Sequence, residues 1–166
     1  AKAYFQPHAE AMARRSMEPD TVMRGREGRQ EEVRHFIDLD AHMPAPFRDF
    51  PRDYREAERR FGKREVDQNG VVPWVILRFR RQLSTAIAAD DPKRLIREAA
   101  YLGHYVTDSF QPLHLTRDYD GQFSGAQGIH KRLENGVADA EIERHIAAAR
   151  RLMRKAQVMR NARDEV

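Results

Sequence analysis

Apolar residues recur at helical spacing along most of the chain, and no stretch alternates in the manner of a β-strand. The clearest case is the segment 73–88, where Trp74, Leu77 and Leu83 share a helical pattern that follows a proline in the first turn. Helices are predicted over residues 1–16, 30–37, 52–61, 73–88, 91–110 and 129–133, and from residue 138 into the basic tail. This pattern predicts an all-α fold, a single multi-helical domain over residues 1–166.

Turn-forming residues separate these helices. Loops are predicted for the proline-bearing stretch 43–51, for Asn69-Gly70 and for the segment 118–128, which is rich in Gly, Asp, Ser and Gln. His42, in the proline-bearing loop, and His145, on a charged helix, are expected to face solvent.

Composition narrows the chemistry. The chain has 166 residues, of which 40% are apolar and 34% charged, as suits one helical domain with solvated outer faces. No apolar run approaches the length that a transmembrane helix needs. Without cysteine there is no disulfide and no thiolate ligand, so any metal must be held by imidazole and carboxylate. The net charge of +4 is compatible with an anionic substrate, although mixed charges are also typical of an ordinary solvated surface.

The candidate chemistry lies in histidine–carboxylate pairs. His104 and Asp108 are four residues apart on a predicted helix, so their side chains share one face and can bind one metal ion. Pro112 breaks this helix and directs His114 away from its axis. His130 and Glu134 repeat the four-residue spacing. A single such pair is more often a surface hydrogen bond, but two pairs with a histidine between them predict more than one metal ion, with zinc the candidate.

Several ordered motifs carry a resemblance to a known family. The string LGHYVTDSFQPLH at 102–114 is similar to the signature helix of the zinc-dependent phospholipase C and S1/P1 nuclease superfamily. Further motifs that resemble this superfamily are Glu18-Pro-Asp20, His35-Phe-Ile-Asp38, Val72-Pro-Trp74 and Gly128-Ile-His-Lys-Arg-Leu-Glu134. The resemblance extends from about Asp20 to Glu134, which is most of the chain.

The resemblance implies two zinc sites and a set of roles. The ligands that it implies for the first zinc are Asp20, His35, His104 and Asp108, and those for the second are His114, His130 and Glu134, with water completing the shell. It implies that Asp20 and Asp108 are catalytic, with Asp20 as the general base, and that Phe36 and Asp38 contact substrate. Arg24 lies one position later than the arginine that the nucleases carry after their first aspartate.

The resemblance also implies a third zinc, toward which Asp108 would bridge, completed in the family by an N-terminal tryptophan and a nearby histidine. This sequence opens with Ala1-Lys-Ala-Tyr-Phe, so we expect the N-terminal metal-binding segment to be missing and the chain to be inactive without it. No signal peptide is present, yet members of the superfamily are typically exported, and a secreted or periplasmic location is the expectation.

The activity expected from the resemblance is hydrolysis of a phosphodiester by zinc-activated water. Glu134, where the nucleases usually carry aspartate, the short loop between His114 and His130 and the absence of cysteine favour a phospholipase C-like enzyme acting on phospholipid. One alternative is a nuclease of the S1/P1 type that prefers single-stranded nucleic acid. The other is a non-catalytic helical module whose metals only hold the fold. The sequence does not predict the oligomeric state.

Overall fold

The computed structural model describes residues 2–137 and 140–152, and every regular element within them is helical. The prediction of an all-α fold is therefore confirmed. The described residues divide into two compact units, one before and one after the boundary between Arg117 and Asp118. That the whole chain functions as one domain stays a prediction.

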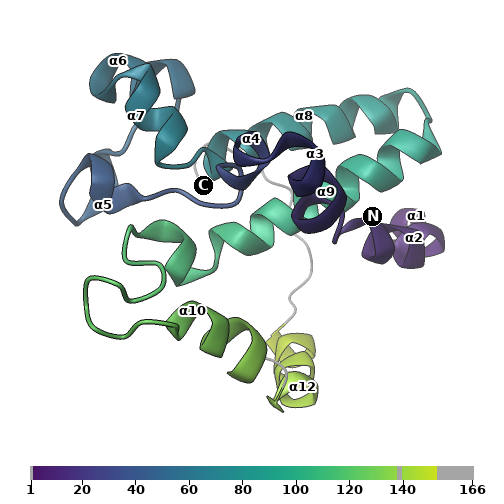
Figure 1. Cartoon of the computed structure of the whole chain (residues 1–166). Coiled ribbons are helices and arrows are strands. Elements are labelled where there is room, and N and C mark those ends of the chain that lie inside the picture. The colour runs from purple at the N-terminus through teal and green to yellow at the C-terminus, as the bar shows by residue number, and fades with distance from the viewer. Residues whose placement is uncertain (1, 138–139, 153–166) are drawn as a thin grey trace. The chain divides into compact units, whose positions relative to one another are not determined.

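The first unit contains the long helices and most of the short ones (Figure 1). Its α-helices are α1 (Lys2–Phe5), α2 (Ala9–Arg15), α3 (Arg24–Glu27), α4 (Arg29–Glu32), α5 (Leu39–His42), α6 (Tyr54–Phe61), α7 (Lys63–Gln68), α8 (Val72–Ala88) and α9 (Pro92–Ser109). Short 3₁₀ turns form at Gln6–His8, Phe47–Asp49 and Pro112–Leu115, and a π-helical turn forms at Pro19–Met23.

Helices α8 and α9 form an antiparallel pair that contains the core of the first unit (Figure 1). Each begins near a proline, and α9 is capped by Asp91, whose carboxylate accepts a hydrogen bond from the Arg94 N–H at 3.0 Å. The Phe79 ring of α8 stacks on the Tyr105 ring of α9 at 5.3 Å between centroids. Buried aromatic area of this kind dominates core energetics. The core thus fixes the register of α9, the helix that carries the central motif.

The segment that follows α4 is not helical, and the prediction of a helix through Ile37 is wrong. Helix α4 ends at Glu32, and the next residues pair with distant backbone groups instead. The carbonyl oxygens of Val33 and Phe36 accept hydrogen bonds from the backbone N–H groups of Val71, at 2.8 Å, and Val72, at 3.2 Å. The N–H groups of Ile37 and Asp38 donate to the carbonyl oxygens of His114, at 2.8 Å, and Asn69, at 2.7 Å. These tertiary hydrogen bonds replace the intrahelical ones that a continued helix would make, so the backbone groups stay paired while the segment leaves the helical path.

Other boundaries also differ from the sequence prediction. The helix expected over residues 1–16 is interrupted by a 3₁₀ turn that contains Pro7. The side chain of His42 is half-buried, with its ring 4.8 Å from that of Phe61 and 5.7 Å from that of Phe50, so the expectation that it faces solvent is wrong. His145 is exposed, as predicted.

The second unit begins with the predicted loop, which extends from Asp118 to Gly128. Within it the Asp120 carboxylate accepts the backbone N–H of His130 at 3.2 Å. The helical parts are α10 (Ile129–Lys131), a π-helical turn (Arg132–Val137) and α12 (Ile142–Leu152). The rest of the helix expected from residue 138 lies outside the described residues.

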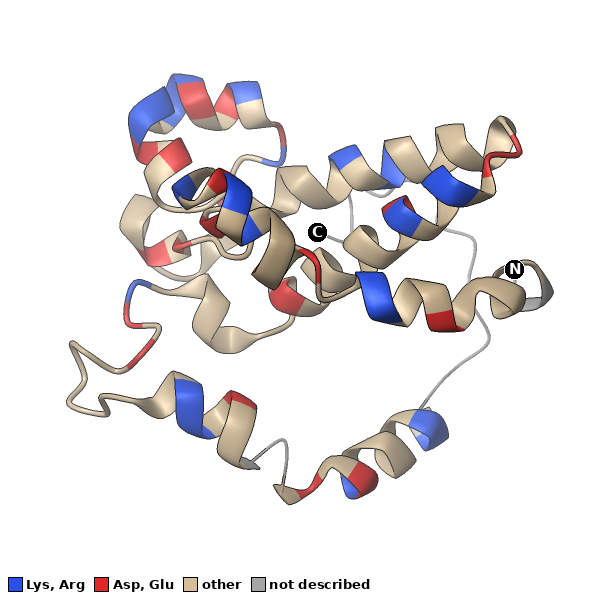
Figure 2. Ribbon diagram, turned by 45° about the vertical axis from the view of Figure 1, so that its right-hand side comes forward, with Lys and Arg blue, Asp and Glu red and all other residues tan. Residues whose placement is uncertain are grey.

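Basic and acidic residues alternate along the same helices, most clearly on α6 (Figure 2). This mixture agrees with a solvated surface. Among the described helices, none has both the length and the apolar character needed to cross a bilayer.

Replacing Gly70 with alanine should destabilise the protein. Gly70 has a φ of +92°, and a Cβ atom there would lie 2.2 Å from the carbonyl oxygen of Phe36. We expect Gly70→Ala to lower the free energy of unfolding in urea by about 2 kcal/mol or more. The control is Gly103→Ala on α9, where a Cβ atom meets nothing within 4 Å; it should raise stability by about 0.5 to 1 kcal/mol. Equal stability of the two variants would contradict the expectation.

Candidate metal centre

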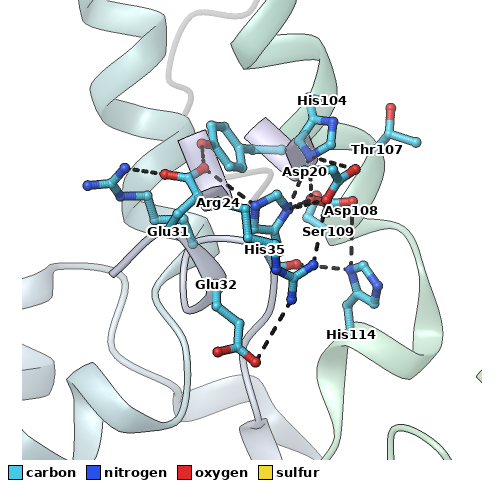
Figure 3. Close-up of polar contacts among 12 residues, drawn as sticks. Asp20, Arg24, Glu31, Glu32, His35, His104, Thr107, Asp108, Ser109 and His114 are labelled. Atoms are coloured by element: carbon cyan, nitrogen blue, oxygen red, sulfur yellow. Dashed lines mark hydrogen bonds and ion pairs between the residues drawn. The ribbon is translucent and has the colours of Figure 1, made fainter. Parts of the chain in front are cut away.

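Four side chains from three parts of the first unit converge on one point (Figure 3). Asp20 comes from the π-helical turn Pro19–Met23, and His35 from the segment after α4. His104 and Asp108 come from successive turns of α9, as their four-residue spacing predicted. The structure therefore brings together the whole ligand set that was predicted for the first zinc.

The distances from the two imidazoles to each other and to the two carboxylates are close to those of tetrahedral coordination. With metal–ligand bonds of about 2.0 to 2.1 Å, neighbouring ligand atoms in a tetrahedron lie about 3.3 Å apart. His35 Nδ1 is 3.1 Å from His104 Nε2 and 2.9 Å from Asp108 Oδ2, and His104 Nε2 is 3.3 Å from Asp108 Oδ2. Asp20 approaches with both oxygens: Oδ1 lies 3.6 Å from His35 Nδ1, and Oδ2 lies 3.7 Å from His104 Nε2. The residues thus fit a small divalent cation with nitrogen and oxygen ligands.

Burial gives the centre an inner and an outer side. The side chain of His35 is 8% exposed and that of Asp108 15%, whereas that of Asp20 is 40% exposed. The half-exposed Arg24 guanidinium lies 4.0 Å from the Asp20 carboxylate and 3.9 Å from the Glu32 carboxylate. Solvent and an anionic ligand would therefore reach the centre from the side of Asp20 and Arg24.

His114 lies next to the centre and is oriented by His35. Its Nδ1–H donates to the backbone carbonyl of His35 at 2.9 Å, because a carbonyl oxygen can only accept. This hydrogen bond leaves the lone pair of the His114 imidazole on Nε2, the arrangement found in metal-ligating histidines. Asp108 Oδ1 lies 3.7 Å from His114 Nδ1, so the two oxygens of Asp108 face different imidazoles.

Sequence reasoning missed a buried polar cluster behind His35. Glu31 is fully buried, and its carboxylate accepts hydrogen bonds from the Tyr105 hydroxyl and from the Arg34 guanidinium. Its Oε1 lies 3.4 Å from Nε2 of His35. A signal was present in the sequence, since Glu31 and His35 have the same four-residue spacing as the two pairs that were noticed.

The electrostatics of the centre favour a bound cation. Burial alone would lower the pKa of His35, but the hydrogen bond to Asp108, the close contact with Glu31 and the charges of Asp108 and Asp20 outweigh burial and raise this pKa to about 9. In the metal-free protein a proton on His35 therefore balances part of the carboxylate charge. A divalent ion can replace that proton, because metal binding requires the neutral imidazole.

Phe36 and Asp38 lie on the segment that contains His35 but have other neighbours. The Phe36 ring lies under the Arg29 guanidinium, 5.8 Å from its centroid. Burial and the nearby Asp40 carboxylate raise the pKa of Asp38 to about 6, although the charges of Arg117 and Arg29 oppose this shift. Their role as substrate contacts stays a prediction.

The ligands predicted for a second zinc belong to different units of the chain. His114 is in the first unit. His130 and Glu134 are in the second, where His130 Nε2 lies 2.9 Å from Glu134 Oε1, as their spacing predicted. The second zinc stays a prediction.

Removing His104 should abolish metal binding at the first site. We expect zinc to raise the stability of the unmodified protein, by about 2.7 kcal/mol when free zinc is one hundred times the dissociation constant. His104→Ala should lose this increase at the first site, as measured by urea unfolding with and without EDTA. His145→Ala, at an exposed position on α12, should keep it. In a His130→Ala background, which removes a ligand of the predicted second zinc, zinc stabilisation that survives in His104→Ala would disprove the assigned ligand set.

The stability of the metal-free protein should depend on pH through His35. Because its folded-state pKa is raised from 6.5 to about 9, its contribution is complete below pH 6.5 and is lost as pH rises through 9. We expect the free energy of unfolding in EDTA to fall over this range by up to about 3 kcal/mol. His35→Gln should lack this part of the pH dependence. An identical pH slope in both proteins would count against the assigned charge balance.

Comparison with known proteins gives no relative: no family model, curated protein or solved structure matches the chain. The function must therefore be inferred from the chemistry of the centre itself.

Proposed function

We propose that this protein is a zinc-dependent phosphodiester hydrolase, similar to phospholipase C. The observation that carries the proposal is the convergence of the Asp20 and Asp108 carboxylates on the imidazoles of His35 and His104, at 2.9 to 3.7 Å, with one side open to solvent. The resemblance of the sequence motifs to the phospholipase C and S1/P1 nuclease superfamily supports the same reaction class. Both point to hydrolysis by water rather than by a covalent nucleophile.

The ligands of the centre differ in exposure, and Asp20 combines two roles, as a ligand and as the general base. His35, His104 and Asp108 are the more deeply buried and would hold the ion. When bound, divalent ions lower the pKa of a coordinated water and offset the negative charge of the phosphodiester. The Asp20 carboxylate is exposed enough to meet a water molecule and to accept its proton as the general base.

The charge around the open side suits an anionic substrate. Arg24 is half-exposed beside Asp20, and a guanidinium can bind phosphate oxygens through two parallel hydrogen bonds. Its ion pairs with Asp20 and Glu32 are long, at 4.0 and 3.9 Å, so a phosphate group could replace them without breaking a close pair. This supports a phosphodiester over a neutral substrate.

A non-catalytic metal module is the competing proposal, because four protein ligands are the usual number in a closed structural zinc site. Three features favour catalysis. The Asp20 carboxylate is partly exposed, and Asp108 turns its second oxygen toward His114. In addition, the positively charged guanidinium of Arg24 lies beside Asp20. A ligand set that served only to hold the fold would need none of these.

The substrate class is proposed from the sequence, where Glu134 and the short loop before His130 favour phospholipid over nucleic acid. We expect the full-length protein, with any N-terminal metal-binding segment present and loaded with zinc, to release diacylglycerol from phosphatidylcholine vesicles and no nucleotides from denatured DNA. Asp20→Asn should lower kcat by about 100-fold or more, because a general base contributes 10² to 10⁴-fold. The matched control is Asp67→Asn, which should retain activity, because the carboxylate of Asp67 pairs with Lys63 on α7 and is not part of the centre.

The alternatives have their own outcomes in the same assay. Release of nucleotides without diacylglycerol would contradict the phospholipase C-like activity and favour a nuclease of the S1/P1 type. Bound zinc with neither product would support the non-catalytic module and overturn the hydrolase.

A further inference from the structure

A buried carboxylate lies directly behind the candidate metal centre. Glu31, on α4, has no exposed surface, and its Oε1 approaches Nε2 of His35, on the side of the ring that faces away from the centre (Figure 3). His35 presents its other nitrogen, Nδ1, to His104 and Asp108. One imidazole therefore connects the centre with a carboxylate in the protein interior.

Burying an ionised carboxylate costs free energy, and hydrogen-bond donors surround that of Glu31. Moving a carboxylate out of water costs several kcal/mol unless it is paired and hydrogen-bonded. The Tyr105 hydroxyl donates to Oε1 and the Arg34 guanidinium to Oε2, while Arg34 also pairs with Glu27 at 2.7 Å. These donors keep Glu31 ionised and fix its position. An apolar side chain would fill the same space without this cost, so stability alone is a weak reason for a glutamate here.

The contact with His35 supplies a reason connected with the centre. Nε2 of His35 is buried and makes no hydrogen bond of ordinary geometry within the described part of the chain. Glu31 Oε1, at 3.4 Å, is the carboxylate oxygen placed to accept its proton. Metal-ligating histidines commonly donate their other ring N–H to a carboxylate, which fixes the tautomer and makes the ligating nitrogen a better donor.

We propose that Glu31 is a positioning residue of the metal centre, which holds the Nε2–H of His35 so that the Nδ1 lone pair faces the bound ion. The inference depends on the proposed function, since it needs a metal at this centre. Binding of a cation at Nδ1 draws electron density from the ring and makes Nε2–H a stronger donor, so the contact with Glu31 should shorten in the loaded protein.

The competing role is purely structural. Through Tyr105 and Arg34, Glu31 joins α9 to the chain around α4, and its loss could loosen the fold without any specific effect on the ion. Metal affinity and the stability of the metal-free protein must therefore be measured separately.

The test compares two buried glutamates. Glu31→Gln keeps the shape of the side chain but removes its charge. Glu98→Gln is the matched control, because Glu98 on α9 is 2% exposed and pairs with Arg97 rather than with a ligand. Both variants are made in a His130→Ala background, so that the titration reports on the first site. Zinc affinity is measured by competition with a chelator, cobalt(II) binding by its visible spectrum, and metal-free stability by urea unfolding in EDTA.

We expect Glu31→Gln to bind zinc 10- to 100-fold more weakly than the parent and to show an altered cobalt spectrum, because substitutions of such supporting residues have effects of this size. Glu98→Gln should match the parent in both. The proposal is overturned if the two variants bind zinc equally well, or if the loss for Glu31→Gln follows only from a less stable metal-free fold.

A second variant covers the case in which Glu31→Gln does not fold. Replacing the cluster as a whole, with Glu31→Leu, Arg34→Met and Tyr105→Phe together, leaves no unpaired buried charge and is often neutral for folding. This variant should show the same loss of zinc affinity, and parent-like affinity would overturn the proposal. If the parent protein binds no zinc, the proposed function fails too; if it binds zinc but Glu31→Gln binds equally well, only the role of Glu31 fails.

Discussion

The candidate metal centre depends on the backbone hydrogen bonds that hold residues 33–38 in a non-helical path. Val71 and Val72 donate to this segment from one side, and Ile37 donates to the carbonyl of His114 on the other. These hydrogen bonds direct the His35 ring toward α9, while the His35 carbonyl accepts a hydrogen bond that orients His114. A helix continued through His35 would satisfy its own backbone groups and would lose these long-range contacts. The backbone of Gly70 approaches that of Phe36 closely at the same place, next to the residues that donate these hydrogen bonds.

Charge balance is the second constraint. Asp20 and Asp108 bring negative charge to an imidazole pair that is largely withdrawn from water, and Glu31 adds a third carboxylate behind it. Carboxylates at this density repel one another unless cations compensate them. Arg34 does so on the inner side, and a proton on His35 does so at the centre. The carboxylate charge is thus partly balanced without metal, and a divalent ion could take the place of the proton on His35.

The sequence predicted the parts of the fold that depend on local signals. Helices α8 and α9 appeared at nearly their observed bounds, because each has a proline at its start and a strong apolar pattern. The prediction failed where distant partners decide. Helix α4 stops early because Asn69 and His114 offer hydrogen bonds to the following residues, and His42 is covered by Phe50 and Phe61. Neither the early end of α4 nor the burial of His42 could be predicted from the residues that are adjacent in the sequence.

The sequence by itself determined the all-α fold and the pairing of His104 with Asp108, since helical spacing brings residues four apart onto one face whatever surrounds the helix. Asp20 and His35 became candidates only through the resemblance of their motifs to the phospholipase C and S1/P1 nuclease superfamily. Only the tertiary structure decided that these two reach α9 at ligand distance and that Asp20 lies on the solvent side. It alone identified Glu31 as the carboxylate behind His35. The reason is physical: local spacing fixes directions within one helix, whereas distances between segments depend on how their backbones are packed and hydrogen-bonded.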